Sequence, residues 1–132
     1  MTLDDREFIT AFEGCTLPGS SFHHREHVRL AWLYLRAHAE DEAERLMAEG
    51  IRRYATSLGA AAKYHHTLSV FWMRACAGAR RLTPGLASFE DFAGTHPELL
   101  DKDLVDRYYS RGVLDTPAAK SGWIAPDLRP LD

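Results

Sequence analysis

Five of the seven histidines in this 132-residue chain fall in two short clusters, residues 22–27 and residues 63–67. In the first cluster His24 and His27 are three positions apart, so on a helix both side chains project from the same face. Two imidazoles at this spacing can bind one metal ion at about 2.0–2.1 Å each. The first cluster therefore predicts a pair of metal ligands on one helix.

The second cluster predicts the third ligand. If the helices that carry the clusters belong to an up-down-up bundle with short loops, both start at the same end of the molecule. His65 shares a helical line with Trp72 and is the expected ligand, while His66 is almost as well placed. The set of His24, His27 and His65, completed by water or a carboxylate, would keep an open coordination position. Zinc and iron are the expected ions, because imidazole suits both.

Acidic and phenolic side chains near the same end could move protons. The first predicted helix ends there and delivers Glu13, and Glu26 belongs to the first histidine cluster. Glu13 or Glu26 would accept a proton and Tyr64 would donate one, while the ion activates water or polarises the substrate. Cys15 in the adjacent loop allows a Cys/His nucleophile pair as a weaker alternative.

Helix N-termini carry a charge of roughly +0.5, which opposes a cation and favours an anion. The same charge supports an anionic substrate beside the metal. It equally supports a metal-free site, in which the histidines bind an anion or act as acid and base. The sequence leaves both interpretations open.

The composition predicts the elements that must position these residues. Leu and Ala total 34 residues and Val and Ile only 7, which favours helices over strands. We therefore expect one all-α domain over residues 1–132. Its architecture would be a bundle of about four main helices, with short C-terminal helices and an extended tail.

Caps and apolar spacing place the helices. The main ones are expected over residues 2–13, 20–38, 41–58 and 60–82, and shorter ones over residues 88–93, 97–100, 104–110 and from residue 116 onward. Thr2 would cap the first helix, with Phe8, Ile9 and Phe12 on one side and Gly14 as its stop. The fourth is apolar on nearly every side, which predicts a central position, and Gly78 in its interior predicts close packing.

One alternative would separate the two histidine clusters. Residues 24–49 contain no Gly or Pro, so the second and third helices could form one continuous rod. His65 would then lie at the far end from His24. Asp41 followed by Glu44 matches a capping box and favours a break.

Charge and composition exclude several classes. The formal net charge of −3 and a pI near 6.1 do not predict a nucleic-acid-binding protein. No stretch approaches the roughly 18 apolar residues of a membrane span, and the start of the chain does not resemble a signal peptide. Cys15 and Cys76 form no disulfide framework, so a cytoplasmic location is expected.

Three segments together resemble a family of small bacterial all-helical proteins without an assigned reaction. They are residues 22–27, residues 63–67 and the closing stretch 123–128, and the pattern is Phe-x-His-x-x-His followed by Lys-Tyr-His-x-Thr. The resemblance covers most of the chain. It implies that Phe22, His24, His27, Tyr64, His65 and Thr67 are shared positions.

Three functions follow as hypotheses. The first is a small metal-dependent enzyme, such as a hydrolase, lyase or oxygenase, that acts on a small and preferably anionic molecule. The second is a non-enzymatic module whose histidines bind a ligand or anion or sense pH, and the third is a metal-free isomerase or lyase using His65 and His27. A homodimer through the apolar helix faces is allowed, although no feature requires it.

Overall fold

The computed structural model describes residues 3–131, and within that range it contains helices and no strand. The four longest helices are α1 (Asp5–Glu13), α2 (His24–Ala37), α3 (Glu40–Ser57) and α4 (His66–Leu82). The shorter ones are α5 (Phe89–Thr95), α6 (Arg111–Leu114) and α7 (Pro117–Ser121). Short 3₁₀ helices connect them: η1 (Gly19–Ser21), η2 (Ala61–Lys63), η3 (Pro97–Leu100) and η4 (Lys102–Arg107). The predicted all-α fold is confirmed.

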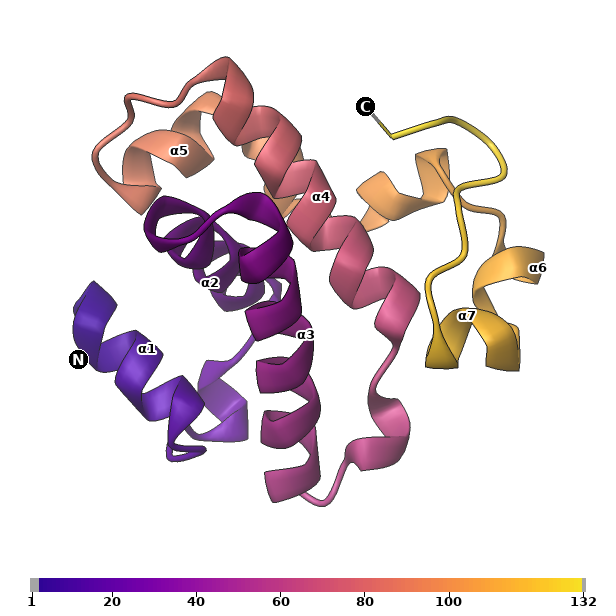
Figure 1. Ribbon diagram of the computed structural model, residues 1–132, viewed down its shortest axis with the longest axis horizontal. Helices are drawn as coiled ribbons and strands as arrows, with labels where there is room; N and C mark the ends of the chain where they lie inside the picture. The colour runs from indigo at the N-terminus through magenta and orange to yellow at the C-terminus, as the bar shows by residue number, and fades with distance from the viewer. Residues whose placement is uncertain (1–2, 132) are drawn as a thin grey trace.

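The helices α2, α3 and α4 pack on one another and form the centre of the bundle. Figure 1 shows α1 on one side of this centre and α6 and α7 on the opposite side. The largest fully buried side chains come from α1 to α5 and from the loop after η4, and they include Phe8, Phe12, Trp32, Met47, Phe71, Phe92 and Tyr109. None of the helices in residues 3–131 combines the length and apolar character needed to cross a bilayer.

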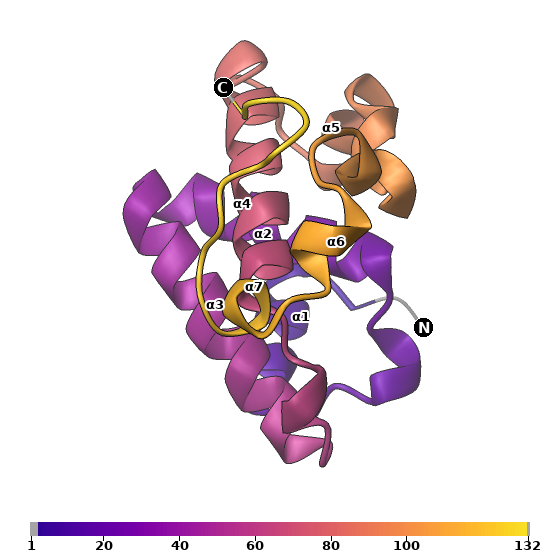
Figure 2. The ribbon, with the colours of Figure 1, turned by 90° about the vertical axis from the view of Figure 1, so that its right-hand side faces the viewer.

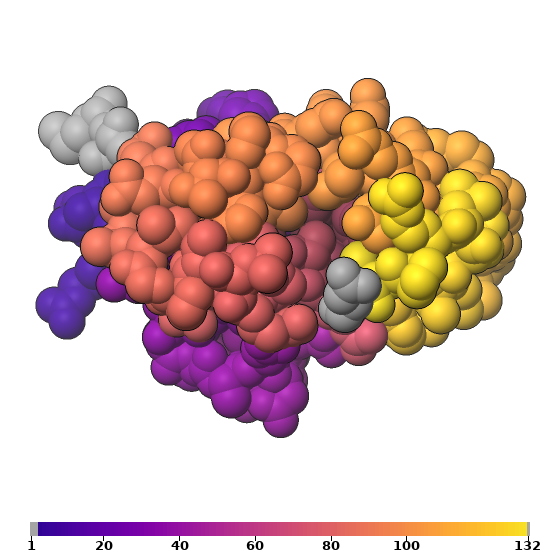
Figure 3. Space-filling model, turned by 90° about the horizontal axis from the view of Figure 1, so that it is seen from above, coloured from indigo at the N-terminus to yellow at the C-terminus, as the bar shows by residue number. Residues whose placement is uncertain are grey.

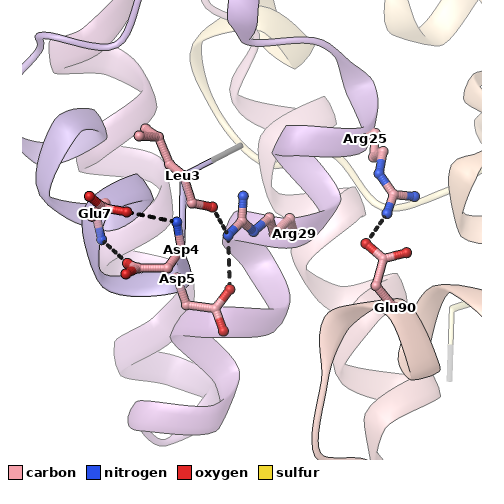
Figure 4. A network of polar contacts seen from close by, with 7 residues as sticks. All are labelled: Leu3, Asp4, Asp5, Glu7, Arg25, Arg29 and Glu90. Atoms are coloured by element: carbon pink, nitrogen blue, oxygen red, sulfur yellow. Dashed lines mark hydrogen bonds and ion pairs between the residues drawn. The ribbon is translucent and has the colours of Figure 1, made fainter. Parts of the chain in front are cut away.

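Helix α1 begins at a capping box of Asp4 and Glu7, in which each side chain accepts a hydrogen bond from the other residue's amide (Figure 4). The predicted cap at Thr2 lies outside the described residues. Phe8 and Phe12 are buried as expected, and the helix ends at Gly14.

Two arginines of α2 bind neighbouring segments, one at the start of α1 and one in α5. Arg29 donates hydrogen bonds of 2.9 Å to the Leu3 carbonyl and to Asp5, which fixes the start of α1. Arg25 pairs with Glu90 of α5 (Figure 4). These exposed and half-exposed pairs set orientation more than stability, because solvent screens them.

The predicted break between α2 and α3 is confirmed, but its predicted signal is wrong. Ala39 is the N-cap of α3 and makes no side-chain hydrogen bond, so Asp41 and Glu44 form no capping box. Packing explains the break instead. As two separate helices, α2 and α3 both pack against α4 and against each other, whereas one long rod would leave much of that apolar surface in water.

Helix α4 starts six residues later than predicted. Residues 61–63 form η2, and Tyr64 and His65 are extended, so the helix begins only at His66 with His65 as its N-cap. The central position of α4 is confirmed, because it packs against α2, α3 and α7. The close packing predicted at Gly78 is wrong, since a Cβ there would meet no heavy atom within 4 Å.

The C-terminal third wraps around α4 (Figure 2). The prediction for residues 97–100 is confirmed, residues 104–110 belong largely to the 3₁₀ helix η4, and α6 was not predicted. The predicted extended strap is confirmed: the Leu128 amide donates to the Tyr108 carbonyl at 2.9 Å, and the Tyr109 hydroxyl donates to the Ile124 carbonyl at 2.6 Å. In the space-filling view of Figure 3 this segment forms one end of the molecule.

Candidate functional site

A cavity of about 310 Å³ lies where the starts of α2 and α4 meet the end of α3. The two histidine clusters reach this cavity from different helices, since both His27 and His65 line it. The shared end predicted from the up-down-up order therefore exists. Its lining consists of Gly19, Phe22, His27, Ile51, Tyr54, Ala55, Leu58, Ala60, Lys63, Tyr64, His65, Leu68 and Ser69.

His27 is the most unusual residue of this lining. Its Nε2 atom is buried and has no hydrogen-bond partner among the described residues. Leaving a buried polar atom unpaired costs roughly 1–3 kcal/mol, so such atoms are uncommon in folded proteins. Burial, and secondarily the neighbouring His24, lowers the pKa of His27 to about 4. The imidazole is therefore neutral at pH 7.

Both ring nitrogens of His65 form hydrogen bonds to other parts of the protein. Nδ1 accepts the amide hydrogen of Leu68 at 3.2 Å and thereby caps α4. Nε2 donates to the Leu114 carbonyl at 2.8 Å and thereby holds α6. The amide fixes the tautomer, because Nδ1 must be unprotonated to accept from it. A metal ion at His65 would have to displace one of these bonds.

His24 lies beside the cavity but does not line it. Its Nε2 donates to the Leu99 carbonyl at 2.8 Å, and its ring meets the edge of Trp72 with centroids 4.3 Å apart. Burial lowers the pKa of His24, although the bond to Leu99 partly opposes the shift. His24 thus anchors η3 against α2.

The three predicted ligands do not converge in this structure. Within residues 3–131 no group of three His, Cys, Asp or Glu side chains is arranged to hold a metal ion. The physical reason lies in the hydrogen bonds of His24 and His65, whose Nε2 atoms each point at a backbone carbonyl. Among the three, only His27 has a buried ring nitrogen without a hydrogen-bond partner among the described residues.

Tyr64 and His66 form a pair at the edge of the site. The Tyr64 hydroxyl lies 2.8 Å from Nδ1 of His66, and the Arg52 guanidinium stands 4.7 Å above the Tyr64 ring. Burial raises the pKa of Tyr64, and burial followed by Arg52 lowers the pKa of His66. Tyr64 lines the cavity, whereas His66 does not.

The two predicted proton acceptors lie elsewhere. Glu13 accepts a 2.7 Å hydrogen bond from the Tyr34 hydroxyl, and Glu26 accepts the His23 amide at 2.8 Å at the start of α2. Neither belongs to the cavity lining. Cys15 is also outside it, at a backbone φ of 58° just after α1.

Aromatic and small polar side chains complete the site, and sequence reasoning missed their role. Phe22 packs on Tyr54 with ring centroids 5.1 Å apart, and the Tyr54 hydroxyl donates to the Leu17 carbonyl at 2.8 Å. Ser69 donates to the His65 carbonyl at 3.1 Å. The sequence did carry a signal, because Ser69 shares the helical line of His65 and Tyr54 is on the apolar stripe of α3.

The electrostatic character of the cavity follows from this lining. Its tyrosine and serine hydroxyls and both nitrogens of His65 already have protein partners. Lys63, which is exposed, is the one lining residue with a full charge among those described. The interior is therefore apolar, with one unpaired imidazole nitrogen.

Comparison of the chain with known protein families, with curated proteins and with solved structures finds no match. The resemblance to a bacterial helical family stays a prediction.

Proposed function

We propose that this protein binds a small molecule in the cavity between α2, α3 and α4, with His27 as its hydrogen-bonding group. The observation that carries the proposal is the unpartnered Nε2 of His27 on a residue that lines a 310 Å³ cavity. Ligand sites are typically apolar hollows of about 300–1,000 Å³ with a few polar groups that fix orientation. This cavity has that composition.

Binding is favoured over acid–base catalysis by the pKa of His27. A general base works best when its pKa lies near the working pH. At a pKa of about 4, His27 is a weak proton acceptor at pH 7 but remains a neutral hydrogen-bonding group. The carboxylates of Glu13 and Glu26 are engaged outside the cavity.

The metal-dependent enzyme predicted from the sequence stays a prediction. It requires His24, His27 and His65 to share an ion, which means rearranging the bonds to Leu99 or to Leu114 and Leu68. Metal analysis of tag-free protein tests it directly. Near-stoichiometric zinc or iron that is lost in both His24→Ala and His65→Ala would overturn a metal-free binding site.

An NMR screen tests the binding proposal. Uniformly ¹⁵N-labelled protein is titrated with a set of neutral and charged one- and two-ring fragments. Shift changes should cluster at Phe22, His27, Tyr54 and Ser69. In Ala55→Phe, where the added ring occupies the cavity, the same fragments should bind at least tenfold more weakly.

Ala48→Phe is the matched control, because Ala48 is on the same helix and does not line this cavity. It should bind the fragments as the wild type does. Shift changes scattered over the surface, or equal binding in both variants, would refute the proposed site.

A further inference from the structure

We infer that the ligand of this cavity is an uncharged, planar two-ring molecule that carries one hydroxyl group. The inference depends on the proposed binding function and adds the chemical class of the ligand.

The volume sets the size of the ligand. A protein cavity of about 150 Å³ accommodates one benzene molecule. The cavity at His27 has about 310 Å³, roughly twice that volume. Two fused rings, or one ring with a short substituent, would fill it, and because the cavity is open to solvent on one side, any larger part of a ligand would lie outside it.

The walls favour a flat ring system. Phe22 and Tyr54 stand side by side with their planes inclined by 54°, and the Tyr64 ring adds a third aromatic surface. Aromatic rings prefer offset-stacked or edge-to-face partners 4.5–7 Å away. Ile51 and Leu68 supply the remaining apolar surface. An aromatic ligand can contact all of these walls at once.

The polar groups select a hydroxyl. His27 is neutral, so each of its ring nitrogens is either a donor or an acceptor, depending on the tautomer. A hydroxyl both donates and accepts and therefore matches either state. The χ2 torsion of histidine has a broad, two-fold preference, so rotation of the ring can bring Nε2 to the ligand.

The same groups disfavour an anion. A carboxylate would lose its hydration in an apolar cavity whose interior offers no cation, and that loss is large. Lys63 lies on the exposed side of the lining and would pair only with a group that stays at the opening. The inferred ligand therefore differs from the anionic substrate expected from the helix N-termini, which stays a prediction.

Three matched probes test this inference on the wild-type protein. Naphthalene, 2-naphthol and 2-naphthoate share one ring system and differ in the polar group. Dissociation constants from NMR titration should be lowest for 2-naphthol. Naphthalene should bind roughly 3- to 10-fold more weakly, as expected for the loss of one hydrogen bond, and 2-naphthoate should be the weakest.

His27→Leu locates the hydroxyl contact. In this variant the advantage of 2-naphthol over naphthalene should disappear while naphthalene still binds. His38→Leu, a change at the exposed C-cap of the same helix, should retain the wild-type preference. The wild-type comparison decides the question even if His27→Leu does not fold.

The two proposals fail in different ways. If none of the three probes shifts the resonances of Phe22, Tyr54 and Ser69, the binding function itself is refuted. If the probes bind there but 2-naphthoate binds tightest, or naphthalene binds as well as 2-naphthol, the cavity is a ligand site and the inferred hydroxyl class is wrong.

Discussion

At the scale of single residues, His24 and His27 show how one motif can serve two purposes. They belong to the same helical face and are both neutral at pH 7, yet His24 donates to the Leu99 carbonyl, whereas Nε2 of His27 has no hydrogen-bond partner among the described residues. A side chain kept for folding is expected to have its hydrogen bonds satisfied. The unpaired one is the better candidate for function.

The difference predicts opposite effects on stability. His27→Leu removes an unpaired buried nitrogen and leaves an apolar side chain of similar size, so the free energy of unfolding should stay level or rise by about 1 kcal/mol. His24→Leu leaves the Leu99 carbonyl without its donor and should lower that free energy by roughly 1–3 kcal/mol. Urea denaturation measures both, and equal destabilisation would contradict a special role for His27.

At the scale of helices, His65 decides where α4 begins. Continuous helix from Ala60 would satisfy the same propensities, but it would remove the cap on Leu68 and the bond to Leu114. Those two bonds are made by one imidazole to segments far apart in the chain. For this reason residue spacing within 60–82 could not reveal the break.

Two substitutions of His65 should therefore separate the contributions of its two hydrogen bonds to the free energy of unfolding. His65→Ala loses both and should lower the free energy of unfolding by roughly 2–3 kcal/mol. His65→Asn restores the N-cap, since asparagine is among the best caps, but it is too short to reach Leu114, and it should recover about 1 kcal/mol. If both variants are equally unstable by thermal or urea denaturation, the cap is not what His65 contributes.

Substitution of Thr67 tests in a similar way what holds the C-terminal segment in place. Its hydroxyl donates to the Gly122 carbonyl at 2.8 Å and accepts the Ile124 amide at 3.2 Å, and the residue is fully buried. Thr67→Val keeps the shape and should cost roughly 1–3 kcal/mol, with faster hydrogen exchange at Ile124. Thr56→Val, at an exposed position of α3, should change the free energy of unfolding by less than about 0.5 kcal/mol. Unchanged exchange at Ile124 would show that the strap is held elsewhere.

These elements also show what the sequence could predict. Apolar spacing identified α1 through α4 and the buried faces of Phe8 and Phe12, because burial follows the helical period. Helix order placed the two histidine clusters at the same end of the molecule, where His27 and His65 line one cavity. The roles of Glu13 and His24 were not predictable, since each depends on a partner that only the folded chain brings near, Tyr34 and Leu99 respectively. The contact of Glu26 with the His23 amide is local.

At the scale of the whole molecule, the neutral histidines make the free energy of unfolding depend on pH. Burial lowers the pKa of His24, His27 and His66 below the ordinary value of 6.5, and for His27 to about 4. Between pH 6.5 and pH 4 the unfolded chain binds a proton at His27 that the folded chain does not bind. The free energy of unfolding is therefore highest above pH 6.5 and falls as the pH falls through this range.

The predicted loss is large enough to measure. One pKa unit corresponds to about 1.4 kcal/mol, so His27 alone should account for a loss on the order of 2–3 kcal/mol between pH 7 and pH 4. Urea denaturation across this range should show a clear slope in the wild type and a smaller one in His27→Leu, because leucine binds no proton. An identical slope in the two proteins would mean that His27 is not held neutral by the fold. A bound neutral ligand in contact with His27 should steepen the slope, since protonating the ring would then also release the ligand.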